Sequence, residues 1–306
     1  MKVLIPAHDS LAEAVAAAVP AADVVSYDNR RAAHLDDVTF YCLPYLGDDE
    51  ARRLINELPA LQIVQSLSSG VDDLATVVPT GVTLCNGRGL HHEESTAELA
   101  VLLVLAALRR LPEFVMAQHE RRWQHERGES VDGKRVLLVG YGSIGRRIER
   151  HLSALGAHVS KVSRTPRDAV ASYEELSDLA RAADVLVVCV PLAPQTVGLV
   201  GAEVLAALPD GALVVNVGRG PTVDAIALRA ELVSGRVRAA LDVTNPEPLA
   251  SDAPEWGLPN VLLTPHVGGD TTTFAERARA FLVDQVARIV TGKEPANVVL
   301  PPAVSP

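Results

Sequence analysis

The segment covering residues 134–167 constrains the fold more than any other part of the chain. It opens with the apolar run "RVLLV", continues with the glycine-rich sequence "GYGSIG", and then follows the amphipathic pattern of a helix. Glycines at these spacings permit a tight turn, close approach of the backbone to a pyrophosphate, and close packing of the helix on the strand. This strand, turn and helix predict a dinucleotide site with the phosphates at the helix N-terminus. The residues predicted to surround the phosphates are Gly140, Gly142, Ser143, Ile144 and Gly145.

Strand-like and helix-like runs alternate along the rest of the chain, which predicts an α/β fold with mostly parallel sheets. A first group has a helix from Ser10, as its cap, to Val19 and strands at 2–5, 38–43, 61–67 and 82–85. A second group forms a doubly wound domain. Its predicted strands are 136–139, 157–162, 184–190, 212–217, 237–242 and 260–264, and its predicted helices are 143–154, 172–182, 201–207 and 222–234.

Two further helices are predicted at the borders of these groups. One begins with a capping box of Ser95 and Glu98 and stops near Pro112. Because this helix is very apolar, we expect it between domains or at a subunit contact. The other ends at Gly292 and is expected to return to the first group, which makes that domain discontinuous. The predicted domains are residues 1–92 with 271–306, and residues 93–270. Between them in sequence, Trp123 is interpreted as a core or dimer-contact aromatic.

Charge and apolar composition exclude several classes of protein. The formal net charge is −10, and no dense block of lysine or arginine offsets it, so neither nucleic acid nor an anionic membrane is an expected partner. No uncharged apolar window reaches about eighteen residues, and the N-terminus lacks the apolar stretch of a signal peptide. We therefore expect a soluble, cytoplasmic protein.

The cysteines and histidines do not suggest a metal or disulfides. Cys42, Cys85 and Cys189 are far apart in apolar runs, as expected of reduced core thiols. His91 and His92 precede two glutamates, but adjacent histidines do not converge on one ion in a regular element. No metal site is predicted.

Three polar motifs follow predicted strands of the second group: "NVGRG" with Arg219, "LDVTNPEP" with Glu247, and "LLTPHVGG" with His266. Each residue alone has a structural alternative: a solvated loop arginine, a turn residue between prolines, and a residue at a helix entry. Because the carboxyl ends of parallel strands meet at one edge, where open α/β sheets bind ligands, we expect all three residues to converge near the cofactor.

In this order and at these spacings, the motifs "SSGVDDL", "GYGSIG", "CVPLAPQT", "NVGRG", "LDVTNPEP" and "TPHVGG" resemble those of the D-isomer-specific 2-hydroxyacid dehydrogenase family. The resemblance covers nearly the whole chain. It implies two Rossmann-like, doubly wound domains, with the substrate domain built from both chain ends and the active cleft between the domains. It also implies a homodimer formed through the nucleotide domains.

The resemblance also implies roles for individual residues. Arg219 would bind the substrate carboxylate and polarise the ketone, His266 would donate the proton, and Glu247 would hold the imidazole. These residue types suit the reaction, because a hydride arriving at a ketone leaves charge on oxygen. The amides of Gly70 and Val71 would hold the substrate carboxylate, the alternative being an ordinary glycine turn. The remaining cofactor-binding residues would be Val190, Pro191, Thr196, Val217, Gly218, Asp242, His266 and Gly268.

The end of the second strand of the nucleotide domain bears on the choice of cofactor. An NAD-preferring site has an acidic residue about 20 positions beyond the glycines, which repels a 2′-phosphate. Here the strand ends with Ser163, Arg164 and Thr165, and Arg167 is close by. Hydroxyls and a guanidinium can bind phosphate oxygens, so we predict that NADP(H) is preferred over NAD(H). The alternative is a solvated turn with incidental arginines.

The predicted function is NAD(P)H-dependent reduction of a small 2-keto acid, glyoxylate or hydroxypyruvate, to a D-2-hydroxy acid. A phosphorylated substrate is not expected, because the position that carries phosphate-binding arginines in related enzymes reads Leu43, Pro44 and Tyr45, and no regulatory domain follows. The alternative is an NAD(P)-sensing binding protein of the C-terminal-binding-protein corepressor type. The compact length and acidic charge count against that alternative.

Overall fold

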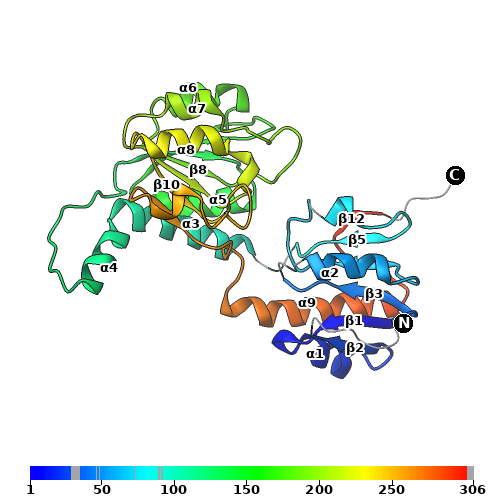
Figure 1. Cartoon of the computed structure of the whole chain (residues 1–306). Helices are drawn as coiled ribbons and strands as arrows, with labels where there is room; N and C mark the ends of the chain where they lie inside the picture. The colour runs from blue at the N-terminus through cyan, green and yellow to red at the C-terminus, as the bar shows by residue number, and fades with distance from the viewer. Residues whose placement is uncertain are drawn as a thin grey trace. The chain divides into compact units, whose positions relative to one another are not determined.

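The computed structural model describes residues 1–28, 35–45, 47, 49–72, 74–88, 90 and 92–301. The chain divides into two compact units, one formed by Met1–His92 with Thr271–Pro306 and the other by Glu93–Asp270. Each unit contains a six-stranded sheet with helices packed on both faces (Figure 1). The predicted α/β class with two doubly wound units is therefore confirmed.

In the first unit the strand order is β12-β5-β4-β3-β1-β2. All neighbouring strands are parallel except β12 and β5, which are antiparallel. The elements are β1 (Lys2–Pro6), η1 (His8–Ser10), α1 (Leu11–Ala18), β2 (Asp23–Tyr27), β3 (Val38–Cys42), α2 (Asp49–Leu54), η2 (Ile55–Glu57), β4 (Ile63–Gln65), η3 (Leu74–Thr76), β5 (Thr83–Cys85), α9 (Thr272–Val290) and β12 (Val298–Leu300).

In the second unit the strand order is β11-β10-β9-β8-β6-β7, and every pair of neighbours is parallel. The chain order reverses between β6 and β8, which is the position where ligands bind in open α/β sheets. The elements are α3 (His92–Leu108), α4 (Leu111–His119), β6 (Arg135–Val139), α5 (Ser143–Ala154), β7 (His158–Val162), η4 (Tyr173–Glu175), α6 (Leu176–Ala180), β8 (Val185–Val188), α7 (Ala202–Ala207), β9 (Leu213–Asn216), η5 (Gly220–Thr222), α8 (Ala225–Val233), β10 (Arg238–Leu241), η6 (Pro254–Gly257) and β11 (Val261–Leu263).

The strands are apolar on both faces because both faces are covered. In the second unit Val136 and Leu138 pack with α3 and α5, while Leu137 and Val139 pack on the opposite face with α6, α7 and α8. Figure 1 shows these two helical layers around the central sheet. Alternate side chains of a strand point to opposite faces, so a continuous apolar run is what a strand between two layers requires.

The long helix after the second unit returns to the first unit, as predicted. In α9, Phe274, Ala278, Leu282 and Val286 are buried in the same core as the residues of α1 and β1. Their spacing of four residues places them along one face of the helix. The helix ends at Val290, and Gly292 follows with φ of 77°, a conformation that glycine adopts without strain.

Two predictions about the apolar helix were wrong. The helix α3 starts at His92, so Ser95 lies inside it and does not cap it. It ends at Leu108, and Pro112 lies in the first turn of the separate helix α4, where a missing N–H breaks no intrahelical bond. The helix packs with α5 on the sheet of its own unit.

Other local predictions also needed correction. Ser10 precedes α1 with φ of 54° and makes no side-chain capping bond. The strand β2 was missed, because its half-exposed edge sequence "DVVSY" lacks a clear apolar run. The helix predicted at 172–182 is shorter, comprising η4 and α6. Trp123 is 99% exposed, so it is not a core residue.

The cysteines are free thiols, as predicted: Cys42 and Cys85 are buried and Cys189 is half-buried. Within the described residues, no helix combines the length and apolar character needed to cross a membrane.

Candidate active site

The glycine-rich turn after β6 has the three local properties expected of a phosphate loop. Gly140 has φ of 107°, and an added Cβ there would lie 2.9 Å from Val190 Cγ1. A Cβ added at Gly145 would lie 2.2 Å from the carbonyl oxygen of Gly140, so α5 can approach β6 only with glycine at this position. At Gly142, by contrast, an added Cβ would meet nothing within 4 Å. The backbone is therefore crowded at Gly140 and Gly145, whereas Gly142 leaves space for a ligand to approach the turn.

This turn fits the pyrophosphate of a dinucleotide. The helix α5 begins at Ser143, directly after the open Gly142. The N–H groups of the first helical turn, including those of Ser143, Ile144 and Gly145, have no acceptor within the helix, and the helix dipole favours an anion there. These residues can bind phosphate oxygens through the backbone alone.

The turn after β7 carries the residues predicted to choose between cofactors. The Ser163 N–H donates to Ala171 O at 3.0 Å, and its hydroxyl donates to Thr165 O at 2.8 Å. Arg164 and Thr165 are exposed. The strand thus ends in hydroxyls and a guanidinium, with no carboxylate among these three residues.

The loop after β8 packs closely on the loop after β9. A Cβ at Gly218 would lie 2.6 Å from Val190 O. The buried Thr196 hydroxyl donates to Pro191 O at 2.7 Å and accepts from Ala193 N–H at 2.8 Å. The side chains of Val190 and Val217 are buried as well. These residues shape the loops, and their contact with a cofactor remains a prediction.

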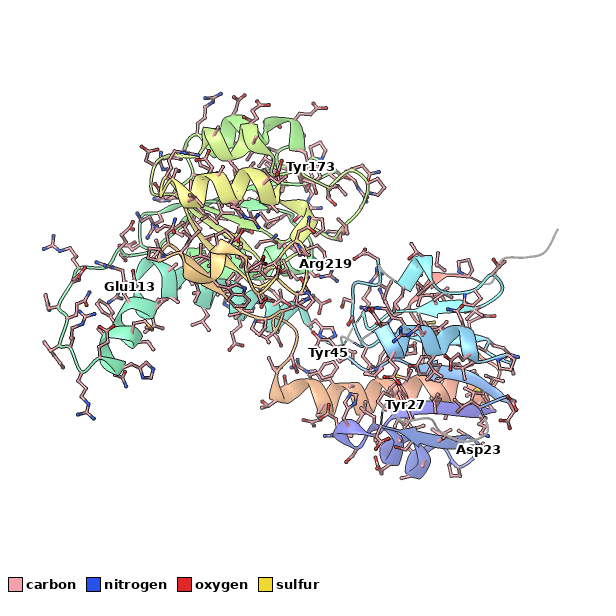
Figure 2. All side chains as sticks on the ribbon, in the orientation of Figure 1. Asp23, Tyr27, Tyr45, Glu113, Tyr173 and Arg219 are labelled. Atoms are coloured by element: carbon pink, nitrogen blue, oxygen red, sulfur yellow. The ribbon has the colours of Figure 1, made fainter. Side chains whose placement is uncertain are left out.

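The backbone of Arg219, after β9, is held by side chains that the sequence analysis missed. The buried Asn216 donates from Nδ2 to Arg219 O at 3.0 Å and accepts from Gly218 N–H at 3.0 Å. The Thr222 hydroxyl donates to the same Arg219 oxygen at 2.6 Å. The guanidinium donates to Gly218 O at 2.8 Å. Figure 2 labels the Arg219 side chain. A polar asparagine that ends the buried apolar strand "LVVN" was the available signal.

The loop of Arg219 also contacts the loop that carries Glu247. A Cβ added at Gly220 would lie 1.8 Å from Thr244 O and 2.2 Å from Thr244 C. Both obstructing atoms belong to the backbone. The structure therefore brings the loops after β9 and β10 together in a contact that only glycine allows.

Asp242 organises the turn that presents His266. Its buried carboxylate accepts from Thr264 Oγ1 at 2.6 Å, from Val267 N–H at 2.9 Å and from Gly268 N–H at 2.9 Å. The Asp242 carbonyl accepts from His266 N–H at 2.8 Å. His266 itself has φ of 54°, in the left-handed region, where non-glycine residues are uncommon. The predicted cofactor residues Asp242 and Gly268 are thus bonded to each other.

His266 and Glu247 form the most direct contact of the predicted site. His266 Nδ1 lies 2.5 Å from Glu247 Oε1, and the other carboxylate oxygen accepts from Thr244 N–H at 3.4 Å. Burial by itself raises the pKa of Glu247. The hydrogen bond and charge of His266, with smaller contributions from Thr244 and Arg219, lower the pKa by more than burial raises it, so the pKa lies below its usual value. With Nδ1 bonded to the carboxylate, Nε2 is the ring nitrogen that can exchange a proton with a substrate.

Gly70 and Val71 lie in the first unit, on the loop between β4 and η3. Asn86 Nδ2 donates to Ser69 O at 2.9 Å, and Gly87 N–H donates to Ser68 O at 2.8 Å, so this loop is firmly held. Val71 is buried and Gly70 is half-buried. Asp73, from the same motif, lies outside the described residues.

His92, the described member of the histidine pair, has a structural role. His92 Nε2 lies 2.9 Å from Leu67 O, and its ring stacks on Tyr45 at 5.6 Å between centroids. His91 lies outside the described residues. In the described part of the chain, no three His, Cys, Asp or Glu side chains are grouped so that they could hold a metal ion.

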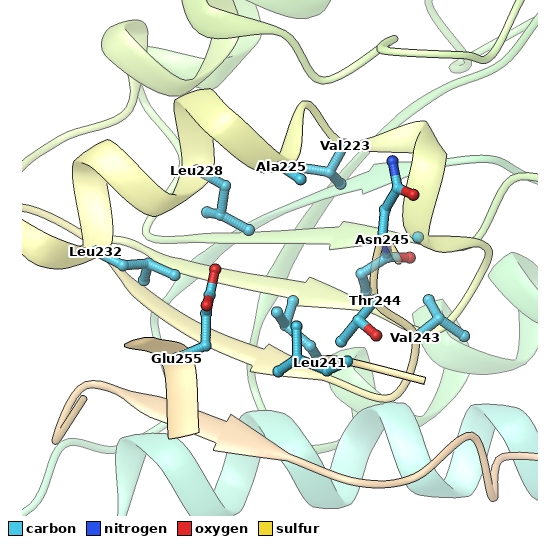
Figure 3. Close-up of a pocket in the computed structure, with 12 residues that line it drawn as sticks. Val223, Ala225, Leu228, Leu232, Leu241, Val243, Thr244, Asn245 and Glu255 are labelled. Carbon is cyan, nitrogen blue, oxygen red and sulfur yellow. The ribbon is translucent and has the colours of Figure 1, made fainter. Parts of the chain in front are cut away.

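A small cavity lies behind the loop of Glu247 (Figure 3). Its volume is about 30 Å³, and apolar side chains of α8 and β10 form much of its wall. Glu255 lines it too, with Oε1 accepting from Arg229 at 2.7 Å and Oε2 buried without a hydrogen-bond partner. Arg219, Glu247 and His266 do not line this cavity, so it is separate from the candidate site that these three residues form.

Comparisons with known proteins identify the family of the chain. The family model described as "D-isomer specific 2-hydroxyacid dehydrogenase, NAD binding domain" matches residues 101–268. Glyoxylate/hydroxypyruvate reductase A of Arabidopsis thaliana is 36% identical over 79% of both chains. A D-3-phosphoglycerate dehydrogenase of Mycobacterium bovis is 35% identical over 77% of this chain, which spans 46% of that protein.

A solved structure covers almost the whole chain. It is an NADPH-dependent glyoxylate/hydroxypyruvate reductase of Sinorhizobium meliloti in complex with NADP and malonate. It is 29% identical, covers 97% of this chain and 96% of its own, and has a TM-score of 0.81. Together with the family model, these similarities show that the chain belongs to the D-isomer-specific 2-hydroxyacid dehydrogenase family.

Proposed function

We propose that this protein is an NADPH-preferring reductase that converts a small 2-keto acid of the glyoxylate or hydroxypyruvate type into the D-2-hydroxy acid. The observation that carries the proposal is the 2.5 Å contact of His266 Nδ1 with Glu247, in the same unit as Arg219 and the glycine-rich turn. A proton donor, a carboxylate that orients it and a cation for the substrate are the groups that ketone reduction requires.

The residues of the site have different roles in this reaction. When bound, the reduced nicotinamide supplies a hydride to the keto carbon. Arg219 pairs with the substrate carboxylate and stabilises negative charge on the carbonyl oxygen, while His266 donates its Nε2 proton to that oxygen. Glu247 keeps the imidazolium oriented and stays ionised. The amides of Gly70 and Val71 bind the substrate carboxylate.

The preference for NADPH is supported by the turn of Ser163, Arg164 and Thr165, which presents donors where an NAD-preferring site has an acid. A tenfold preference in kcat/KM corresponds to about 1.4 kcal/mol, less than one charge-assisted hydrogen bond can contribute. We expect initial rates at low salt to favour NADPH by at least about tenfold. Equal or better use of NADH would contradict this preference.

The substrate class is supported by the glyoxylate/hydroxypyruvate reductases among the similar proteins. Similarity to a phosphoglycerate dehydrogenase leaves a phosphorylated acid as a second candidate. The segment Leu43, Pro44 and Tyr45 has no cation to bind a phosphate, which favours the unphosphorylated acids. A panel of glyoxylate, hydroxypyruvate, an aromatic 2-keto acid and a phosphorylated 2-keto acid tests this choice, and highest kcat/KM with the phosphorylated acid would refute it.

A nucleotide-sensing binding protein is the alternative from another class. Cofactor absorbance during incubation with 2-keto acids separates the two functions, because a sensor binds NADPH without steady oxidation. Sustained turnover that is lost in His266→Ala, while that variant still binds NADPH, would support the enzyme. Binding with no turnover on any acid of the panel would support the sensor.

We also propose that the protein is a homodimer that uses the surface of α3 and α4. Apolar side chains are exposed there, and Trp123 on the segment after α4 is 99% exposed. Exposed apolar groups that gather on one region mark an interaction surface. The members of this surface are Leu102, Leu111, Val115, Met116 and Trp123.

A further inference from the structure

The turn that follows β7, residues 163–171, is closed at its base by backbone hydrogen bonds. Ser163 N–H donates to Ala171 O at 3.0 Å. Nearer the tip, Arg167 N–H donates to Val170 O at 3.1 Å and Val170 N–H donates to Arg167 O at 2.8 Å. These bonds make the turn a defined loop and hold the backbone of Arg167.

The Arg167 side chain connects this turn to the glycine-rich turn after β6. Its Nη2 donates to the carbonyl oxygen of Tyr141 at 2.7 Å, and its guanidinium carbon lies 5.2 Å from the centroid of the Tyr141 ring. A guanidinium can make both contacts at once because it is planar and carries several donors. Arg167 thereby joins two turns that the sequence separates by more than twenty residues.

Tyr141 is itself held from the other side. Its hydroxyl is hydrogen-bonded to Glu149 of α5, and this bond, with burial, raises the pKa of Tyr141. Lys161 of β7 pairs with Glu149 at 2.5 Å, and its ammonium lies 5.3 Å from the Tyr141 ring centroid. The ring contacts two cations and is anchored to α5, so it gives Arg167 a fixed partner.

The side chain of Arg164, unlike that of Arg167, is not held by Tyr141. The neighbouring Ser163 is held on both sides, because its N–H donates to Ala171 O at 3.0 Å and its hydroxyl donates to Thr165 O at 2.8 Å, while the Arg164 side chain is exposed. A guanidinium on a fixed backbone, with its side chain in solvent, can pair with a phosphate without breaking contacts to the protein. For Arg167 to do the same, it would have to give up both contacts with Tyr141.

We propose that Arg167 is a positioning residue of the cofactor site. It holds the turn of residues 163–167 against the glycine-rich turn through Tyr141, and it leaves Arg164 to meet the 2′-phosphate. The inference rests on the proposed function for the identity of the ligand. It predicts a division of labour: Arg167 supports binding of both nicotinamide cofactors, whereas Arg164 separates one from the other.

The test is direct binding of NADPH and NADH to the full chain, followed by cofactor fluorescence at low salt and without a keto acid. Arg167→Ala should weaken both cofactors by a similar factor, about fivefold to tenfold, because the turn loses its attachment. Arg164→Ala should weaken NADPH by at least about tenfold and change NADH by less than about twofold. Raising the salt should reduce the NADPH advantage in Arg167→Ala but not in Arg164→Ala.

Conservative variants separate positioning from general loss of stability. Tyr141→Phe keeps the ring and the carbonyl that Arg167 contacts and removes only the bond to Glu149, so it should weaken both cofactors less than Arg167→Ala does. Arg167→Lys keeps a cation near the ring and should recover part of the affinity. Tyr141→Ala combined with Arg167→Ala should be little worse than Arg167→Ala alone, because Arg167→Ala already removes both contacts between the two residues. Melting temperatures without cofactor show whether each variant is folded.

Three results would overturn the inference. Loss of affinity for NADPH alone in Arg167→Ala would make Arg167 a phosphate ligand. Wild-type affinity of Arg167→Ala for both cofactors would make the attachment irrelevant. Additive losses in the double variant would also contradict it. Wild-type protein that binds neither cofactor would refute the proposed function as well, whereas absence of keto-acid turnover would leave this binding test intact.

Discussion

Gly220 is the position at which one methyl group tests the site geometry most directly. In Gly220→Ala the new Cβ would start 1.8 Å from Thr244 O and 3.0 Å from Asn245 N. An ordinary contact between carbon and a carbonyl oxygen is about 3.3 Å, so the loops after β9 and β10 must separate by about 1.5 Å. The atoms that obstruct the methyl group are backbone atoms, so no side-chain rotation can relieve the contact.

This separation should affect both stability and catalysis. Overpacking usually costs about 1–3 kcal/mol, and we expect the upper end because rigid backbone must move. For a domain of this size that corresponds to a fall in Tm of about 6–12 °C. The neighbouring Arg219 would shift relative to Glu247, and a displacement of about 1 Å near the reacting groups reduces kcat/KM by about 10²-fold.

The assay compares Gly220→Ala with Gly257→Ala, a control in the same unit where an added Cβ meets nothing within 4 Å. Differential scanning calorimetry gives Tm, and steady-state rates with a 2-keto acid give kcat/KM. The control should stay within about 2 °C of the wild type in Tm, as surface substitutions usually do. If Gly220→Ala matched the control in both measurements, the close contact between the two loops would be refuted.

Three further predictions concern charge and assembly. The bond to His266 lowers the pKa of Glu247, so this carboxylate stays ionised at neutral pH and its contribution to reductive kcat/KM should be lost only as the pH falls into the acid range; Glu247→Gln should lower kcat/KM at neutral pH and abolish that acid loss, and a variant with the wild-type rate and pH profile would contradict the role of Glu247. Arg219→Ala should lose about 10²-fold in kcat/KM, about 3 kcal/mol, and Arg219→Lys should recover only part because an ammonium cannot pair with both carboxylate oxygens; near-normal rates would remove Arg219 from the site. Trp123→Asp should halve the mass measured by light scattering, and an unchanged mass would place the dimer contact elsewhere.

The sequence alone predicted the parts of the protein that depend on short-range patterns. A glycine-rich turn between an apolar strand and an amphipathic helix is local, and the predicted bounds of α5, 143–154, match the structure. Apolar runs covered the buried strands, because strands between two helical layers have no polar face. The edge strand β2 lacks such a run and was missed. A capping pattern at Ser95 also misled, since the same residues occur inside helices.

The contacts that orient the candidate site could not be predicted from the sequence. Motif order placed Arg219, Glu247 and His266 at one edge of a parallel sheet, but it could not show that Asn216 and Thr222 hold the Arg219 backbone, or that Asp242 forms the turn of His266. Nor could it show that Arg167 contacts Tyr141. These contacts join residues that are brought together only when β6 to β11 pair in order, and hydrogen bonds of about 3 Å depend on positions that residue spacing does not specify. Tertiary packing therefore decided which side chains orient the reacting groups and which ones can meet a ligand.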